Sequence, residues 1–244
     1  MKSIMIKYQK TRRYNQEFIS KNLMGPNAMM LLEEMTKYFN LKSGMRILDL
    51  GCGTGLTSIF LAKEYGVKVI AYDLWISETE NYERFKSIGL DDHIEAIQGD
   101  ANVMPFPNDY FDGVISVDSY QYYGSNDKFF TEKLQPILKN NAIVAIAVPG
   151  MSVELGDRIP EEMKPYWDEE SFNTWHTIDW WQQEFSELLN SIIVKEMACF
   201  DEAWSDWLNT DNPHAITDRD MIKIDGGRYM NLIAIIGRVN KLYL

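Results

Sequence analysis

The chain has 244 residues, of which 45% are hydrophobic and 25% charged, and its formal net charge is −12. This length suits one α/β domain with a modest insertion, and the acidic balance argues against a nucleic-acid partner, because phosphate binding needs a basic face. With only two cysteines, no metal-ligand spacing and no apolar run long enough to span a bilayer, we expect a cytoplasmic protein with neither a metal nor a membrane partner.

The first forty residues predict an arm followed by a helix. Residues 1–24 are polar with scattered tyrosines, which indicates an irregular arm or a short helix. Residues 27–39 follow Gly25-Pro26, and Met29, Leu32 and Phe39 recur at helical spacing. The sequence leaves open whether the arm lies over a functional site or on the free surface.

The next stretch, residues 45–55, reads MRILDLGCGTG. An apolar run predicts a buried strand, three alternate glycines predict a tight turn, and helical periodicity begins directly afterwards. Glycine allows a positive φ and lets a ligand approach the main chain closely. A dinucleotide fingerprint would need its third glycine at position 56, where Leu56 stands. The pattern is instead D-x-G-x-G-x-G, from Asp49 to Gly55.

Four further buried strands are predicted at residues 67–74, 94–99, 110–118 and 142–148, and a helix at residues 127–138. An acid stands at or just beyond the end of the first three of these strands: Asp73, Asp100 and Asp118. The carboxyl ends of parallel strands form the ligand crevice of an open α/β sheet. We therefore expect the three acids and the glycine turn to share one site.

The remaining chain departs from this rhythm. Two segments, residues 149–177 and 201–220, are irregular, aromatic and acidic. A long segment without a clear period, such as residues 149–177, is typical of a functional lid. A helix is predicted over residues 178–189, and strands over 192–200 and 229–239.

The glycine motif resembles motif I of the class I S-adenosylmethionine (SAM)-dependent methyltransferases, and the likeness covers roughly residues 25–150 and, more loosely, the last strand. Within that family the chain is similar to bacterial small-molecule methyltransferases with an aromatic lid. The resemblance implies a doubly wound, seven-stranded, mostly parallel sheet whose last strand is antiparallel between the fifth and sixth. It also implies one domain over residues 1–244: an arm (1–24), a SAM-binding core (25–150), a lid (151–177) and the rest of the sheet (178–244).

The resemblance also assigns cofactor residues. Asp73 would accept the ribose hydroxyls, Asp100 and the backbone of Ala101 would hold the adenine amino group, and Asp118 would lie next to the transferable methyl. Leu74 would flank the adenine together with Trp75. The full predicted set for SAM, or its product S-adenosylhomocysteine, is Asp49, Gly51, Cys52, Gly53, Thr54, Gly55, Asp73, Leu74, Asp100, Ala101 and Asp118.

The acceptor side is less constrained by the sequence. His176 in the lid is the best candidate for a general base, and Tyr122 for a hydroxyl that orients the acceptor. Further candidates for acceptor contacts are aromatic: Tyr120, Tyr123, Trp180, Trp181 and Trp204. Aromatic rings set among acids suit a cationic amine, although an apolar acceptor fits a similar lining and each ring could instead serve core packing.

We therefore predict a monomeric or homodimeric enzyme that transfers the SAM methyl group to a nitrogen or oxygen of a small molecule. A methyltransferase acting on RNA or protein is an alternative, disfavoured by the acidity of the chain and by the absence of an N-P-P-Y signature after residue 118. A non-catalytic SAM sensor is another, because the acids at positions 49, 73 and 100 would support binding equally well. An NAD-dependent oxidoreductase is disfavoured by Leu56. The acceptor molecule and its reacting atom stay open.

Overall fold

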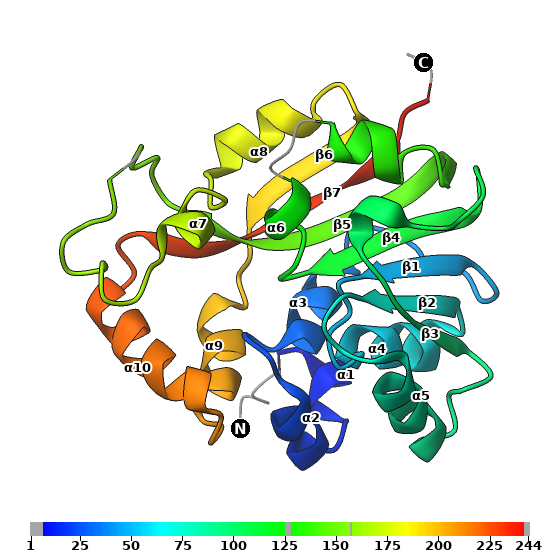
Figure 1. Ribbon diagram of the computed structural model, residues 1–244, viewed down its shortest axis with the longest axis horizontal. Coiled ribbons are helices and arrows are strands. Elements are labelled where there is room, and N and C mark those ends of the chain that lie inside the picture. Colours follow the sequence, from blue (N-terminus) through cyan, green and yellow to red (C-terminus); the bar gives the residue numbers. More distant parts are fainter. Residues whose placement is uncertain (1–6, 125–127, 157, 242–244) are drawn as a thin grey trace, which may run out of the picture.

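A computed structural model of the chain describes residues 7–124, 128–156 and 158–241. Seven strands form one sheet in the order β3-β2-β1-β4-β5-β7-β6 (Figure 1). Strands β1 to β5 pair in parallel, and β7 is antiparallel to both β5 and β6. The strands are β1 (Arg46–Leu50), β2 (Lys68–Asp73), β3 (Ile94–Gln98), β4 (Phe111–Val117), β5 (Leu138–Met151), β6 (Leu189–Glu196) and β7 (Met230–Val239). The predicted fold class is confirmed, including the place of the last strand.

Helices cover both faces of this sheet. One layer contains α3 (Ala28–Met35), α4 (Leu56–Tyr65), α5 (Glu78–Ser87), α9 (Phe200–Leu208) and α10 (Pro213–Asp225). The other contains α6 (Gln121–Gly124), the π-helical turn η2 (Phe130–Leu134) and α8 (Ile178–Phe185). The short elements α1 (Gln9–Arg12), α2 (Gln16–Asn22), η1 (Ala101–Val103) and α7 (Glu169–Phe172) complete the described structure.

The alternation of side chains along each strand explains the two layers. In β1, Ile47 packs into the first layer, whereas Leu48 and Leu50 pack into the second. Successive side chains of a strand point to opposite faces, so a strand buried on both sides reads as a continuous apolar run. The apolar strands that the sequence displays are therefore the consequence of helices on both faces.

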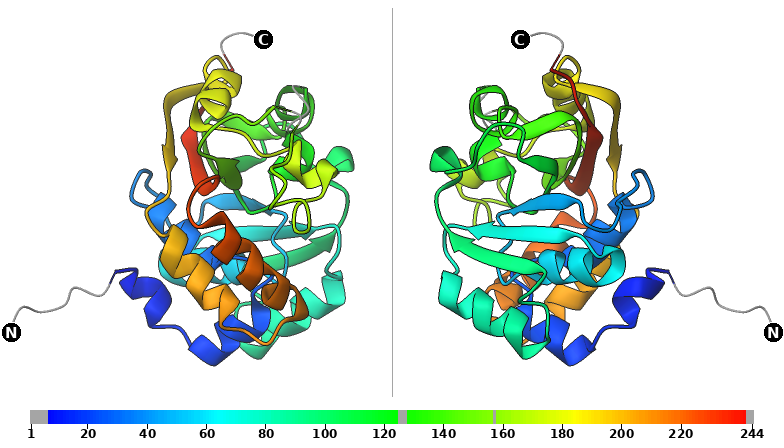
Figure 2. Two further views of the ribbon diagram at one scale, coloured as in Figure 1. Left: turned by 90° about the vertical axis from the view of Figure 1, so that its left-hand side faces the viewer. Right: turned by 90° about the vertical axis from the view of Figure 1, so that its right-hand side faces the viewer.

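The arm is fixed to α3 by buried carboxylates. Glu33 accepts hydrogen bonds from the backbone N–H and the hydroxyl of Thr11, at 2.8 and 2.7 Å. Tyr8 donates its hydroxyl to Glu34 at 2.8 Å. The arm also reaches α9, where Arg12 pairs with Asp206 at 2.8 Å. The blue N-terminal helices lie beside the orange α9 (Figure 2).

Several elements of the structure differ from those predicted from the sequence. Residues 201–220 are largely helical rather than irregular, because Asn212 caps α10 and Pro213 occupies its first turn. The helix expected over residues 127–138 is the π-helical turn η2, which ends before Pro136; residue 127 itself lies outside the described part. Asn141 adopts the left-handed conformation, with φ of 63°, as the turn before the apolar part of β5 requires.

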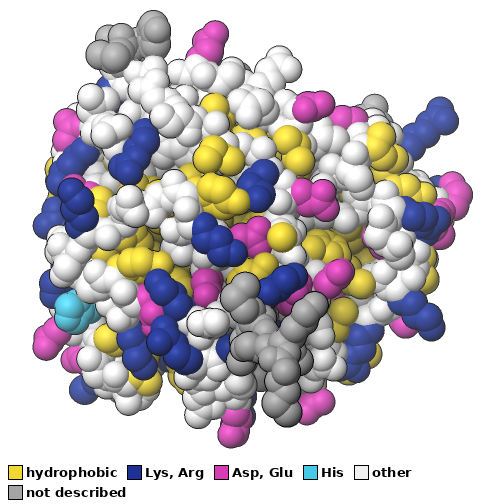
Figure 3. All heavy atoms as spheres, turned by 180° about the vertical axis from the view of Figure 1, so that it is seen from behind, with side chains coloured by type: hydrophobic (Ala, Val, Ile, Leu, Met, Phe, Trp, Pro, Cys, Tyr) yellow, Lys and Arg dark blue, Asp and Glu magenta, His cyan; other side chains and the backbone are white. Residues whose placement is uncertain are grey.

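The surface carries charges of both signs. On the face seen from behind, Lys and Arg side chains are interspersed with Asp and Glu (Figure 3). In the described part of the chain, every helix is too short or too polar to cross a bilayer.

Candidate functional site

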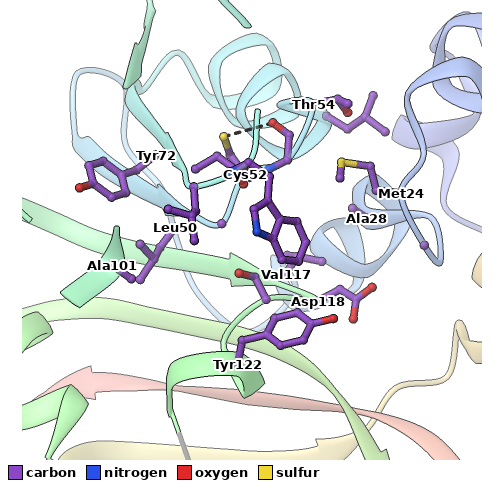
Figure 4. Close-up of a pocket in the computed structure, with 18 of the residues that line it drawn as sticks. Met24, Ala28, Leu50, Cys52, Thr54, Tyr72, Ala101, Val117, Asp118 and Tyr122 are labelled. Atoms are coloured by element: carbon purple, nitrogen blue, oxygen red, sulfur yellow. Dashed lines mark hydrogen bonds between the residues drawn. The ribbon is translucent and has the colours of Figure 1, made fainter. Parts of the chain in front are cut away.

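A cavity of 350 Å³ lies at the carboxyl ends of the four strands β1 to β4 (Figure 4). Its walls come from the loops that follow these strands and from the end of the arm. The lining residues are Asn22, Leu23, Met24, Gly25, Pro26, Ala28, Leu50, Gly51, Cys52, Gly53, Thr54, Leu56, Tyr72, Asp73, Leu74, Trp75, Gly99, Asp100, Ala101, Asn102, Val117, Asp118, Ser119, Tyr122 and Tyr123. The structure thus brings most of the predicted cofactor residues together in one place.

The glycine turn is shaped by both backbone and packing. Gly51 has a φ of 70°, and a Cβ there would lie 1.8 Å from the hydroxyl oxygen of Ser119. Gly55 has a φ of 79°, and a Cβ there would lie 2.4 Å from the ring of Phe85. Larger residues would meet both strain and a clash. Because Gly55 is the N-cap of α4, the free N–H groups of that helix start at this turn, where they favour a polar or anionic ligand group.

Asp73 joins the end of β2 to this turn. One of its carboxylate oxygens, Oδ2, accepts the backbone N–H of Gly53 at 2.7 Å. The other, Oδ1, accepts the backbone N–H groups of Trp75 and Ile76 at 2.8 and 2.9 Å. A carboxylate offers roughly four acceptor positions, so these three bonds leave room for a further donor from a ligand.

Asp49 does not line the cavity. It is 1% exposed, and its Oδ2 accepts the hydroxyls of Thr57 and Ser58 at 2.6 and 2.5 Å. Burial raises the pKa of Asp49 to about 6, against the lowering effect of the two hydroxyls. Asp49 therefore lies behind the turn and holds the start of α4 against β1. This placement corrects the expectation that Asp49 contacts the cofactor.

Asp100 and its neighbours form the far end of the cavity. Asp100 is exposed, and its Oδ1 accepts the backbone N–H and the side-chain amide of Asn102 at 2.8 and 2.9 Å. These bonds lower the pKa of Asp100, so it is ionised at neutral pH. Ala101 lies beside it at the start of η1, and Leu74 lines the same cavity from the loop after β2.

Asp118 occupies the opposite end, directly after β4. Its backbone is left-handed, with φ of 54°, and such a conformation in a non-glycine residue is often found at functional sites. A Cβ on Gly25 would lie 2.6 Å from its Oδ2, so the arm packs closely against the carboxylate. Burial raises the pKa of Asp118 to about 7; the amide of Gln121, 3.4 Å away, opposes this, and the negative charge of Asp218 adds to it.

The three tyrosines after β4 separate into two groups. Tyr122 is 56% exposed and lines the cavity, and its ring centroid lies 5.9 Å from that of Trp75. Tyr123 also lines it, and its hydroxyl oxygen is 3.1 Å from those of both Ser116 and Ser119. Tyr120, in contrast, is buried in the second layer against the rings of three residues: Phe129, Trp181 and Phe185. Its expected contact with an acceptor is thereby corrected to core packing.

The remaining acceptor candidates lie away from the cavity. His176 stacks on Trp180 with ring centroids 3.8 Å apart, and its Nδ1 is 3.7 Å from a carboxylate oxygen of Glu154. Burial lowers the pKa of His176, so it is neutral at pH 7. Trp181 and Trp204 are buried in opposite layers. The structure does not bring these four aromatic residues to the cavity, and each packs against other parts of the chain.

The sequence left open whether the arm reaches a functional site, and the structure places the end of the arm on the cavity wall. Residues 22–24 of the arm line the cavity together with Gly25 and Pro26, and the hydroxyl of Thr54 donates to the backbone oxygen of Asn22 at 2.6 Å. Met24 reaches over the cavity beside Ala28 (Figure 4). One local feature of the sequence marked this part of the wall, the small residue at position 25. The contacts that hold the arm in place join residues far apart in the sequence, so no local pattern displays them.

Comparison with known proteins extends these observations. Residues 47–141 match a family model described as a methyltransferase domain. Norajmaline N-methyltransferase of Rauvolfia serpentina is 25% identical over 126 residues, which are 49% of this chain and 43% of that protein. Fatty-acid O-methyltransferase of Mycolicibacterium smegmatis is 35% identical over 91 residues, covering 36% of this chain and 32% of that protein. The chain thus spans less than half the length of these curated relatives.

Among solved structures, phosphoethanolamine N-methyltransferase 2 of Haemonchus contortus, in complex with phosphomonomethylethanolamine and S-adenosylhomocysteine, is similar with a TM-score of 0.73. The two sequences are 20% identical, and the likeness covers 90% of this chain and 55% of that one. At this identity the likeness concerns the fold. It agrees with the predicted fold, and the segment that matches the methyltransferase-domain model contains the glycine motif.

Proposed function

Because this chain carries a methyltransferase domain with the class I fold, we propose that it is a SAM-dependent methyltransferase that acts on a nitrogen or oxygen of a small molecule. The observation that carries the proposal is the order of groups along one cavity. Asp100, Asp73, the glycine turn and Asp118 follow the strand order β3-β2-β1-β4.

This order matches the parts of the cofactor. Adenine would lie at Asp100 and Ala101, the ribose at Asp73, and the methionine portion at the glycine turn beside the N-terminus of α4. Neighbouring strands lie about 4.8 Å apart, so the row spans roughly 14 Å, the scale of an extended nucleoside joined to an amino acid. The methyl group would then lie close to Asp118. Bound SAM would supply a sulfonium methyl group that is open to in-line attack.

The chain itself supplies position and shelter. The end of the arm lines the cavity, with Met24 close to Gly53 and Gly25 against Asp118. Leu74 would flank the adenine, and Trp75 would cover the ribose and extend to the acceptor side, where its ring lies 5.9 Å from that of Tyr122. Tyr122 and Tyr123 stand where an acceptor would approach the methyl group. Holding donor and acceptor in line contributes as much as about 7–11 kcal/mol to lowering the barrier of such a reaction. The placement of His176 gives no support to its role as a base.

An enzyme also fits the cavity better than a sensor does. A sensor needs only to enclose SAM, whereas Tyr122 and Trp75 are 56% and 66% exposed at the Asp118 end of the cavity. An acceptor can therefore approach from solvent on that side.

Isothermal titration of the purified chain with SAM, S-adenosylhomocysteine and NAD tests the cofactor. We expect micromolar binding of SAM and its product and none of NAD. Absence of SAM binding would refute the proposal. Transfer of a radiolabelled methyl group from SAM to a panel of small amines and hydroxyl compounds then tests catalysis, and a binding protein with no transfer would be a sensor.

A further inference from the structure

We propose that the Asp118 end of the cavity recognises the methyl acceptor as a cation, with an ammonium group held between the Asp118 carboxylate and the rings of Trp75 and Tyr122. This inference rests on the proposed function and deepens it, because it names the charge class of the substrate. The aromatic lid residues that suggested an amine site in the sequence take no part in it.

The charge of the cavity wall is the first step. Three carboxylates line the cavity or its rim, at positions 73, 100 and 118, and none of the lining residues described is Lys, Arg or His. A low-dielectric cleft lined by one sign of charge concentrates ligands of the opposite sign. The wall therefore disfavours an acceptor that carries its own carboxylate or phosphate close to the reacting atom.

Asp118 is the carboxylate of this wall with the least compensation. Asp73 accepts three backbone N–H groups, and Asp100 accepts two N–H groups of one neighbour. Asp118 accepts, within the described residues, one weak side-chain bond at 3.4 Å from Gln121. A carboxylate in such surroundings gains most from a cationic partner, since its charge is poorly solvated and its acceptor positions are free.

The aromatic pair supplies the second half of the subsite. The rings of Trp75 and Tyr122 meet at 63° with centroids 5.9 Å apart, and both rings are more than half exposed. Tyr122 lies next to Asp118 in the cavity (Figure 4), and the negative charge of Asp118 contributes to the raised pKa of its hydroxyl. An alkylammonium group is attracted to the faces of such rings.

The charged groups around Asp118 act in the same direction. Asp218 on α10 adds negative charge near Asp118, and Asp168, which precedes α7, adds it near Tyr122. Tyr122 itself stays neutral at physiological pH, because desolvation of its hydroxyl group and the charges of Asp118 and Asp168 raise its pKa. Gln121 on α6, three residues after Asp118, is the polar side chain that faces the Asp118 carboxylate.

A pair of isosteric probes tests the inference directly. Choline is a permanent cation, and 3,3-dimethylbutan-1-ol has the same shape without the charge; neither titrates near neutral pH. Each is titrated into the chain saturated with S-adenosylhomocysteine, and the indole N–H signal of Trp75 is followed by nuclear magnetic resonance. At pH 8 we expect choline to bind at least tenfold more tightly than the alcohol. Its affinity should rise about tenfold from pH 6 to pH 8 as the Asp118 carboxyl, with its pKa of about 7, ionises.

Two variants locate the effect. In Asp118→Asn the preference for choline and its pH dependence should disappear. In Asp91→Asn, which removes an equal charge at a site outside the cavity, both should persist. Equal affinity of the wild type for the two probes, or a preference that survives in Asp118→Asn, would overturn the inference. A tenfold loss of S-adenosylhomocysteine affinity in Asp118→Asn would overturn it too, by making the carboxylate a cofactor contact. Failure of the wild type to bind S-adenosylhomocysteine would instead refute the proposed function.

Discussion

Asp73 accepts the backbone N–H of Gly53 at 2.7 Å, and this bond ties the end of β2 to the glycine turn that follows β1. The side chain proposed to hold the ribose therefore also holds the loop on which the methionine portion would rest. We expect both cofactor affinity and the stability of the turn to depend on this one carboxylate.

The first prediction concerns this coupling. Asp73→Ala removes a charge-assisted ribose contact and leaves up to three backbone N–H groups without their acceptor. We expect SAM affinity to fall at least tenfold, about 1.4 kcal/mol, and the free energy of unfolding to fall by about 1–3 kcal/mol. Calorimetric titration and urea unfolding measure the two effects. Asp91→Ala is the control for a lost acid, and unchanged SAM affinity in folded Asp73→Ala would remove Asp73 from the site.

The second prediction separates backbone strain from steric clash at two glycines. Gly44 has a φ of 83°, and the space that a Cβ would enter there is open to a radius of 4 Å, whereas Gly51 has a φ of 70° with Ser119 atoms at 1.8 and 2.4 Å from such a Cβ. Gly44→Ala should cost about 1–3 kcal/mol of unfolding free energy from strain alone. Gly51→Ala should cost more, because Ser119 must also move, and it should abolish SAM binding. Equal losses of unfolding free energy in the two variants would show that Ser119 can move away from a Cβ at position 51 without a free-energy cost.

The third prediction uses the buried acid behind the turn. The pKa of Asp49 is raised to about 6 in the folded chain, so this group stabilises the fold at low pH, and that contribution is lost as the pH rises through 6. In Asp49→Asn this loss is absent, and the amide oxygen can still accept the hydroxyls of Thr57 and Ser58. Between pH 5 and pH 8, the wild type should lose on the order of 1 kcal/mol of unfolding free energy relative to the variant. Urea unfolding at both pH values checks this, and parallel curves would contradict the raised pKa.

The fourth prediction concerns Trp75 as a reporter of the cofactor. Because its ring is 66% exposed at the cavity, S-adenosylhomocysteine should shift and quench its fluorescence. Trp75→Phe should remove most of this change. Trp204→Phe, which alters a buried ring outside the cavity, should keep it. If the signal persists in Trp75→Phe, the cofactor does not lie against this side chain.

The sequence could reveal much of the fold because the relevant signals are local. The alternating and continuous apolar runs mark the strands, and the three glycines at alternate positions require the turn. Sequence and topology together place Asp73 and Asp118 at one edge of the sheet, since parallel strands bring their carboxyl ends together. The position of a residue at the end of a strand can therefore be predicted without knowing which residues it contacts in space.

Whether a side chain is exposed, and which residues it contacts, depends on tertiary packing and not on the local sequence. Tyr120 and Tyr122 stand two residues apart in the same tyrosine-rich loop, yet one is buried against α8 and the other lines the cavity. His176 stacks on Trp180 instead of reaching the site, and residues 22–24 of the arm reach it without any motif.

The sequence by itself determined the order of the strands along the chain, the glycine turn and the acids at the strand ends, because periodicity and backbone preference act over a few residues. Only the tertiary structure decided that Asp49 braces the helix, that the end of the arm lines the cavity, and that Asp118 lies beside Tyr122 with few hydrogen-bond partners among the described residues. Those outcomes depend on contacts between segments far apart in the chain, whose packing sets which side chains are desolvated and which remain open to a ligand.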